Sequence, residues 1–446
     1  MIDVTQDQSQ YLTHFERIEK TVGRNGPAWL VPIRKAAISR FVEMGFPTVK
    51  DEEWRYTNVA PIANTAFEPA RDTKPDVSRK ALAPFLFDGC CATLVVVNGR
   101  FCAELSSAGN LPKGVRVASI EAALKTDDVA LEPYLARHAD YHHQPFAALN
   151  TALIEDGAFV FVPRGIVLEE PIHVLYVTAG SDQRLVAHPR TLIVAEESSQ
   201  VTVVESYAGL GDGAYFTNAV TELVSGENAT LDHVKVEREN AEAFHIGTFH
   251  VHTDRNSTIH SHVVSLGGAL VRNEINALLD GEGGHCALNG LYQIGGTQHV
   301  DNHLHVEHAK PRCDSREFFK GVLDGSARGI FSGRIYVEKD AQKTDAKQTN
   351  MSLLLSEEAQ VESKPQLEIF ADDVKCTHGA TIGQIDEDAV FYLRARGLSE
   401  TAARSLLVFT FANESLERIA VPALRRQLEQ LILRRLPQGQ LLQEWT

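Results

Sequence analysis

Glu197-Ser-Ser-Gln-Val201 is the first of six short segments that decide the fold, because each joins a turn of acidic, Asn, Ser or Gly residues to an alternating β run. The other five are Glu227-Asn-Ala-Thr-Leu231, Arg255-Asn-Ser-Thr-Ile259, Glu282-Gly-Gly-His-Cys286, Gly325-Ser-Ala-Arg-Gly-Ile330 and Glu357-Glu-Ala-Gln-Val361. The apolar residues that close these segments follow one another at intervals of 30, 28, 27, 44 and 31 residues. A period of this length, built of strands, is typical of a solenoid in which each coil stacks on the next.

We therefore predict a mainly β protein whose core, residues 146–385, is a β-helix, also called a β-solenoid. The long interval between Cys286 and Ile330 is expected to hold an insertion or extra strands. A β-sandwich is the alternative fold, since it also consists of short strands separated by turns. A single sandwich rarely needs about 240 residues, so the solenoid is favoured.

Helical patterns flank this core. Residues 1–84 predict an N-terminal helical region with two helices between residues 9 and 46, and residues 85–145 predict a small mixed α/β module with a hairpin turn at Asn98-Gly99. The C-terminal helical region, residues 386–446, predicts three helices, the second capped by Ser399 and the third running from about Ser415 to Leu436. The apolar stripe of the third helix either docks a partner or packs back on the solenoid.

Charge and composition narrow the class of protein. The chain of 446 residues carries 43 basic and 59 acidic residues, a formal charge of −16 that disfavours non-specific binding to nucleic acid and to anionic membranes. The N-terminus lacks the pattern of a secretory signal, and no apolar run approaches about 18 residues, so we expect a cytoplasmic protein. The six cysteines form no Cys-x-x-Cys pair, which argues against a disulfide framework and a zinc ribbon.

Cys376 and His378 form the only Cys-x-His pair, and they lie where the β pattern ends. In an extended strand both side chains point to the same face. A thiol beside an imidazole can bind zinc, iron or an iron–sulfur cluster. A closed metal site usually needs about four ligands, so the missing ones are expected from elsewhere, for example from another chain.

Eleven of the eighteen histidines lie between His233 and His308. They include three His-x-His pairs: His250/His252, His260/His262 and His303/His305. The last pair is followed by Glu307, but a cupin metal site has its Glu four or five residues after the second His, where this chain has Ala309 and Lys310. We therefore expect histidines on the polar faces of strands. A stand-alone His-rich metal-binding protein or metalloenzyme is the alternative function.

Two enzyme classes are disfavoured by what the sequence lacks. No Gly-x-x-x-x-Gly-Lys-[Ser/Thr] pattern is present, so the chain is not expected to hydrolyse ATP itself. A carbohydrate-active β-helix would need a groove of Asp or of Lys and Arg residues, and the repeat shows no such recurring set.

Two motifs resemble the SufB/SufD family of the SUF iron–sulfur cluster assembly system. One is Asp372-Asp-Val-Lys-Cys-Thr-His-Gly-Ala-Thr-Ile-Gly-Gln-Ile-Asp386 with Phe391-Tyr-Leu-Arg-Ala-Arg-Gly397. The other is Pro47-Thr-Val-Lys-Asp-Glu-Glu-Trp-Arg-Tyr-Thr57, which contains the signature residues Trp54, Arg55 and Tyr56. SufB-like sequences carry Cys-Glu-His-Glu-Ala where this chain has Cys376-Thr-His-Gly-Ala380, so the resemblance is to the SufD branch. Without the resemblance, Trp54 and Tyr56 are expected to pin the N-terminal helices to the next domain.

The resemblance implies a non-catalytic scaffold subunit. Such a subunit pairs with a SufB-like subunit through the end of its β-helix and holds a SufC-like ATPase on its C-terminal helices. A homodimer is the alternative for the isolated chain, and no nucleic acid or membrane is expected as a partner. The residues expected to bind the ATPase are Tyr392, Arg394, Arg396, Leu406, Phe409 and Phe411.

The resemblance also implies roles for the Cys-x-His pair. His378 and Cys376 become candidate ligands of a transient iron–sulfur cluster, or of iron, at the SufB–SufD interface. No cofactor is expected to bind stably to the chain alone. The resemblance leaves open the type of cluster, the donors of sulfur and iron, and the participation of flavin.

Overall fold

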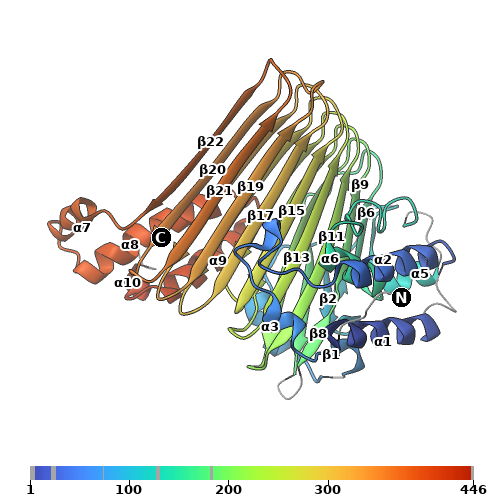
Figure 1. The fold of residues 1–446 in the computed structure, drawn as a ribbon. Coiled ribbons are helices and arrows are strands. Elements are labelled where there is room, and N and C mark those ends of the chain that lie inside the picture. The colour runs from blue at the N-terminus through green and yellow to red at the C-terminus, as the bar shows by residue number, and fades with distance from the viewer. Residues whose placement is uncertain (1–5, 22–26, 74, 127–130, 181–183, 443–446) are drawn as a thin grey trace.

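The computed structural model describes residues 6–21, 27–73, 75–126, 131–180 and 184–442. The chain forms a β-solenoid of about seven turns, with helices at its N-terminal and C-terminal ends (Figure 1). The predicted fold class is confirmed. None of the helices in these described ranges has the length and apolar character needed to cross a membrane.

Two sheets of parallel strands form the walls of the solenoid, and successive strands alternate between them. Sheet A contains β6 (Gly157–Val162), β9 (Arg190–Ala195), β11 (Tyr215–Ser225), β13 (Phe244–Thr253), β15 (Leu270–Leu279), β17 (His299–His308), β19 (Arg328–Val337) and β21 (Gln360–Ile369). Sheet B contains β7 (Ile172–Ala179), β10 (Gln200–Leu210), β12 (Thr230–Arg238), β14 (Thr258–Ser265), β16 (His285–Ile294), β18 (Asp314–Leu323), β20 (Asp345–Leu354) and β22 (Lys375–Gly383).

The first coils receive short additional strands. In sheet A these are β5 (Arg116–Ser119), β1 (Glu68–Pro69) and β8 (Leu185–Ala187), and in sheet B they are β2 (Ala92–Val97), β3 (Arg100–Phe101) and β4 (Ser107–Ala108). The predicted hairpin at Asn98-Gly99 is confirmed by the antiparallel pairing of β2 with β3. Because β2 also pairs in parallel with β7, the segment 85–145 contributes strands to the solenoid itself.

The stacked coils are in register, so equivalent positions form columns along the solenoid. The column that begins at Val201 in sheet B runs through Leu231, Ile259, Cys286, Ser315 and Ala346 to Cys376. Its members as far as Ala346 are buried, because they point into the lumen between the two sheets. Each coil therefore places one residue of this column in the core.

No insertion lies between Cys286 and Ile330, but the alternative expectation of extra strands is confirmed, since both β17 and β18 lie within this interval. Ile330 pairs with Asp301 and Glu362 in sheet A, whereas Cys286 lies in sheet B and is followed in its own column by Ser315 after 29 residues. The interval of 44 residues runs from a turn at one edge of the coil to a turn at the other edge, so it spans about one and a half coils. The coil itself is of ordinary length.

Helices cover the first coils. They are α1 (Gln6–Thr21), α2 (Leu30–Met44), α3 (Ala60–Ala63), α4 (Arg79–Leu82), α5 (Ile120–Lys125) and α6 (Pro145–Ala152), with the 3-10 helices η1 (Glu52–Trp54), η2 (Ala70–Asp72) and η3 (Ala83–Phe85). The two helices predicted between residues 9 and 46 are confirmed as α1 and α2. Residues 146–152 were expected to open the solenoid but form α6, which begins with Pro145 in its first turn.

The C-terminal region folds back on the solenoid (Figure 1). Its helices are α7 (Glu387–Arg394), α8 (Glu400–Leu416), α9 (Pro422–Arg435) and α10 (Gly439–Leu442). Ser399 is confirmed as the cap of α8, since its Oγ accepts a hydrogen bond from the N–H of Ala402 at 3.1 Å. The third helix begins at Pro422, later than predicted, because proline favours the first helical position. Leu424 and Leu428 of α9 pack on sheet B, so this apolar stripe is covered by the solenoid.

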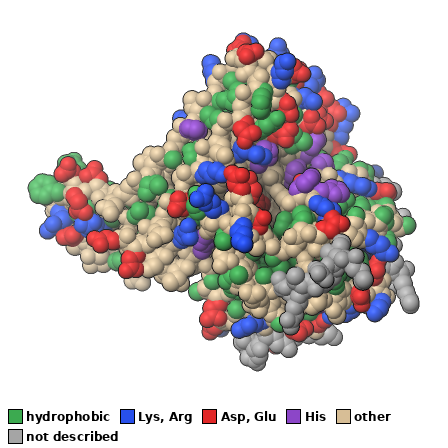
Figure 2. All heavy atoms as spheres, viewed as in Figure 1, with side chains coloured by type: hydrophobic (Ala, Val, Ile, Leu, Met, Phe, Trp, Pro, Cys, Tyr) green, Lys and Arg blue, Asp and Glu red, His purple; other side chains and the backbone are tan. Residues whose placement is uncertain are grey.

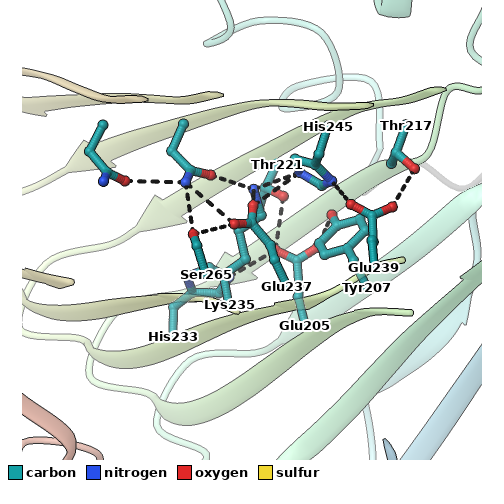
Figure 3. A network of polar contacts seen from close by, with 12 residues as sticks. Glu205, Tyr207, Thr217, Thr221, His233, Lys235, Glu237, Glu239, His245 and Ser265 are labelled. Carbon is teal, nitrogen blue, oxygen red and sulfur yellow. Dashed lines mark hydrogen bonds and ion pairs between the residues drawn. The ribbon is translucent and has the colours of Figure 1, made fainter. Parts of the chain in front are cut away.

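The lumen also contains charged groups, which form a continuous network in the coils from β10 to β15 (Figure 3). His233 Nε2 lies 2.8 Å from Glu205 Oε2, and Lys235 Nζ lies 2.7 Å from Glu237 Oε1. His245 Nδ1 lies 2.7 Å from Glu239 Oε2. Burial of charge is costly unless it is paired, and each of these three carboxylates has a basic partner.

Another buried charge pair fastens residues 136–139 and α6 to sheet A. Arg190 and Glu222 are both fully buried, and Arg190 Nη2 lies 2.5 Å from Glu222 Oε2. Glu222 also accepts hydrogen bonds from the four backbone N–H groups of residues 136–139, and Arg190 donates to Asn150 of α6. Burial raises the pKa of Glu222, but Arg190 and these N–H groups outweigh it and hold the pKa below its usual value. The Glu222 carboxylate thus provides the hydrogen-bond acceptor for all four backbone N–H groups of residues 136–139.

We predict that Glu222→Gln destabilises the chain by about 3–5 kcal/mol, because it breaks a buried ion pair and leaves Arg190 uncompensated. Glu197→Gln is the matched control, since Glu197 pairs with Arg164 at 2.8 Å on the exposed surface of the same solenoid. The control is expected to change the free energy of unfolding by no more than about 0.5 kcal/mol. Urea unfolding of both variants measures the difference, and equal small effects would contradict the assignment.

Candidate functional site

The solenoid ends at β21 and β22, the last strands of the two sheets. Among the described residues, each of these strands pairs with another strand along only one of its edges. The other edge therefore presents free backbone N–H and C=O groups. Large apolar side chains are exposed beside this open end: Ile369 is 37 %, Phe370 57 % and Ile382 47 % exposed. An exposed strand edge with apolar side chains is typical of a surface that another chain covers.

Cys376 and His378 both lie on β22, which confirms that this segment is extended. Cys376 continues the lumen column that begins at Val201. His378 continues the neighbouring lumen column, directly after Gln348 and Glu317. Both side chains therefore face the lumen, and because β22 is the last strand in the described part of the chain, Cys376 is half-buried and His378 is exposed. The pair lies in the mouth of the solenoid.

The thiol of Cys376 is not activated by its surroundings. It packs against an apolar cluster that includes Ile335, Ala346 and Ala371. Burial raises the pKa of this thiol above its usual value. Since the thiolate is the form that binds metal, a metal ion or a partner must stabilise the deprotonated sulfur.

The pair alone does not make a closed metal site. Among the described residues, no three His, Cys, Asp or Glu side chains are placed to hold a metal ion. A thiol and an imidazole suit iron or an iron–sulfur cluster, but two ligands leave about two positions unfilled. The open end leaves room for a second chain to supply them.

The histidine pairs of the central strands face outward. His250, His252, His303 and His305 lie on the outer face of sheet A, where Figure 2 shows histidine side chains gathered in a hollow. Three of them, His250, His303 and His305, line a cleft of about 740 Å³ between sheet A and residues 44–54. Its histidines have separate partners: His303 lies 2.6 Å from Glu53, and His305 Nδ1 accepts a hydrogen bond from Arg334. The expectation of histidines on polar strand faces is confirmed for these pairs.

Residues 47–57, which we call the strap, cross the outer face of sheet A. Trp54 is buried, and the guanidinium of Arg272 lies 3.8 Å from the centre of its ring. Thr57 donates a hydrogen bond of 2.6 Å to Asp301 of β17. Trp54 therefore pins the N-terminal region to the solenoid as expected, whereas Arg55 is exposed and Tyr56 is half-buried.

The strap is also held by a charged histidine. Burial lowers the pKa of His303, but Glu274 and Glu53, which contact its two ring nitrogens, outweigh this effect and raise the pKa to about 9. His303 is therefore protonated at neutral pH, and it links the strap to β15 through two carboxylates.

The residues expected to bind the ATPase divide into two groups. Tyr392, Arg394 and Arg396 lie on or just after α7, which projects from the solenoid (Figure 1), and Tyr392 is 56 % exposed. Leu406, Phe409 and Phe411 lie on α8 and pack on the apolar cluster against sheet B.

Phe409 is only 5 % exposed, so a direct partner contact by this ring is not available in this structure. Phe391 begins the family motif but was not among the expected contact residues, and it is 72 % exposed on α7. An apolar residue among the charged residues of a short helix was the signal that could have found it.

The chain matches two family models. "SUF system FeS cluster assembly, SufBD core domain" covers residues 176–411, and "SufBD protein N-terminal region" covers residues 5–174. The chain is 34% identical to an iron–sulfur cluster assembly SufBD family protein of Synechocystis over 90% of each chain. It is 32% identical to the iron–sulfur cluster assembly protein SufD of Escherichia coli, over 92% of this chain and 93% of that protein. The identity to SufD of Bacillus subtilis is 28%, over 92% and 94%.

We predict that the stabilising effect of His303 is present below about pH 6.5 and is lost as the pH rises through about 9, because the folded-state pKa lies above the usual value of 6.5. The urea midpoint of the wild type should exceed that of His303→Gln at pH 6.5. The two midpoints should converge towards pH 9.5. A constant difference across this range would show that the charge of His303 does not hold the strap.

Proposed function

This chain belongs to the SufBD family of iron–sulfur cluster assembly proteins of the SUF system, and from that premise we propose that it acts as a SufD-type scaffold subunit. The observation that carries the proposal is the position of Cys376 and His378 in the open mouth of the solenoid. A scaffold needs ligands that hold a cluster while it forms and release it afterwards. An incomplete, accessible ligand set suits that task better than a closed site.

The partner at the open end is proposed to be a SufB-like subunit. The edges of β21 and β22 need backbone partners, and Ile369, Phe370 and Ile382 need cover. A second solenoid that meets this end with its own edge strands would satisfy both needs. It would also bring the missing ligands to Cys376 and His378, so that the cluster forms between the two chains.

The partner at the C-terminal helices is proposed to be a SufC-like ATPase, in which the ATP hydrolysis of the complex takes place. Phe391 and Tyr392 give α7 an exposed aromatic surface, and the guanidinium of Arg396 lies 4.3 Å from the centre of the Tyr392 ring. Exposed Tyr, Phe and Arg side chains are typical anchors of protein interfaces. We propose α7 as the docking element, and α8 and α9 as its support on sheet B.

The path from the ATPase to the cluster site is short. β22 ends at Gly383 and α7 begins at Glu387, so residues 384–386 alone separate the strand that carries Cys376 and His378 from the docking helix. A rigid-body movement of α7 would pull directly on β22. We propose that closure of the ATPase subunits opens the mouth of the solenoid in this way, and that iron or the nascent cluster is handled there as cargo.

We predict that His378→Ala leaves assembly with co-expressed SufB-like and SufC-like partners intact but lowers the yield of iron–sulfur cluster at least about tenfold, the usual cost of losing a key group at a metal site. Light scattering measures assembly, and iron and sulfide analysis with absorption spectroscopy measures the cluster. His260→Ala is the control, because His260 is an exposed histidine paired with Asp232 on the outer face of sheet B.

Two outcomes would contradict this prediction. Unchanged cluster yield in His378→Ala would remove His378 from the site. If the wild-type chain remains a monomer or a homodimer in the presence of both partners, the proposed complex itself is wrong.

We predict that Phe391→Asp and Phe370→Asp each weaken one of the two proposed interfaces and leave the other unchanged. Phe391→Asp should weaken binding of the SufC-like partner about tenfold or more and leave binding of the SufB-like partner unchanged, because an exposed anchor on α7 is replaced by a charge. Phe370→Asp, at the open end, should show the opposite pattern. Titration calorimetry with each purified partner measures both affinities, and loss of both partners in either variant would contradict the division.

A further inference from the structure

A layer of polar side chains lies in the lumen beneath the open end. Glu317, Gln348 and Asn350 are each at most 2 % exposed. Each has one side-chain oxygen without a hydrogen-bond partner in the protein: Glu317 Oε1, Gln348 Oε1 and Asn350 Oδ1. Most buried polar atoms in proteins are paired, so these three unpaired acceptors in the coils of β18 and β20 are available to a further group.

Two neighbours restrict the orientation of the Gln348 amide, Glu317 on β18 and Gly333 on β19. Its Nε2 donates a hydrogen bond to Glu317 Oε2 on the neighbouring strand. A Cβ atom on Gly333 of sheet A would lie 2.2 Å from this Nε2, so the amide occupies space that a side chain at Gly333 would take. Burial raises the pKa of Glu317 to about 8, although the hydrogen bond from Gln348 acts in the opposite direction. The hydrogen bond to Glu317 directs the Nε2 end of the Gln348 amide to β18 and leaves Oε1 as the unpaired end.

His378 is the next residue after Gln348 in the same lumen column. Strands in a sheet lie about 4.8 Å apart, which places the two side chains side by side across β20 and β22. A histidine that binds metal through one ring nitrogen usually donates its other N–H to a carbonyl or carboxylate oxygen. Gln348 Oε1 is an unpaired oxygen of this kind next to His378.

We propose that Gln348, oriented by Glu317, is a positioning residue for His378: its Oε1 accepts one imidazole N–H and leaves the other ring nitrogen free to bind iron. The inference rests on the proposed role of His378 as a cluster ligand. It gives a reason for the change in the lumen column from Leu288 to Glu317 and Gln348 near the open end. An apolar column would fill the core equally well but would not orient a terminal histidine.

Asn350 offers a matched control for Gln348. Both are buried amides on β20, and both have an unpaired oxygen. Asn350 differs in its position, because it donates to Ser363 and lies next to Ala380 in its column, where no imidazole can use its oxygen. Gln348→Met and Asn350→Leu therefore remove similar groups, but only one of them lies beside His378.

The test uses the complex of this chain with its SufB-like and SufC-like partners, under anaerobic conditions. Titration calorimetry with ferrous iron alone should show about 10- to 100-fold weaker binding in Gln348→Met, the usual cost of losing such a supporting group, and a change of less than about twofold in Asn350→Leu. After reconstitution with iron and sulfide, pulsed EPR of the reduced cluster should show a changed histidine-nitrogen coupling in Gln348→Met alone. This coupling reports the orientation of the ring, which a general loss of stability does not alter.

A conservative variant keeps the inference testable if Gln348→Met fails to fold. Gln348→Glu retains a side-chain oxygen acceptor of the same reach, and protonated Glu317 can donate a hydrogen bond to it. Its affinity for ferrous iron is therefore expected to lie within about fivefold of the wild type, a smaller change than the loss of an orienting group causes. Equal losses in Gln348→Glu and Gln348→Met, equal losses in Gln348→Met and Asn350→Leu, or no loss in Gln348→Met would each overturn the inference.

His378→Ala separates the inference from the proposed function. If His378→Ala binds ferrous iron as the wild type does, the proposed function of His378 fails, and the inference fails with it. If His378→Ala loses iron and Gln348→Met does not, only the role of Gln348 fails.

Discussion

The backbone hydrogen bonds between stacked coils are the interaction on which the rest of this structure depends. Each strand of the solenoid pairs with the strand one coil before it and the strand one coil after it, so every coil satisfies the donors and acceptors of its neighbours. The last coil cannot do this for itself. At the first coils the N-terminal region supplies additional strands and helices, whereas at the last coil β21 and β22 are left with free edges. The candidate site lies where the pairing stops.

The same register determines what the lumen contains. Because each column places one side chain per coil in the core, a change of residue type along a column changes the chemistry at one level only. The coils around β12 hold paired charges, the rings of Phe319 and Phe331 pack together further along, and Glu317 and Gln348 bring polar groups back near the open end. The packing of the core and the chemistry of its mouth are therefore set by the same columns.

The sequence predicted the solenoid because its turns recur with the length of a coil, and it predicted the shared face of Cys376 and His378 because side chains alternate along a strand. It could not show that this face is the lumen, since that depends on pairing between residues about 30 positions apart. The two turns of each coil resemble each other in composition, which is why Ile330 was placed in the wrong column.

The helices show a similar limit. Apolar residues of α7 and α8 follow the same helical pattern, yet Phe409 is buried on sheet B and Phe391 is exposed. A helical pattern shows which residues share a face but not what covers that face. Gln348 and Glu317 were missed for a related reason, because a polar residue inside a strand gives no sign in the sequence that its neighbour in space is His378.

The open edge of β21 and β22 also has a consequence for how the cell must make this protein. Two parallel sheets that end side by side, with exposed Phe370 and Ile382 next to their edges, present a template on which further strands can add. If another chain covers this edge, as we propose, a molecule synthesised in excess of that chain is exposed to self-association and aggregation. Coordinated synthesis of the two chains is then a condition of solubility as well as of function.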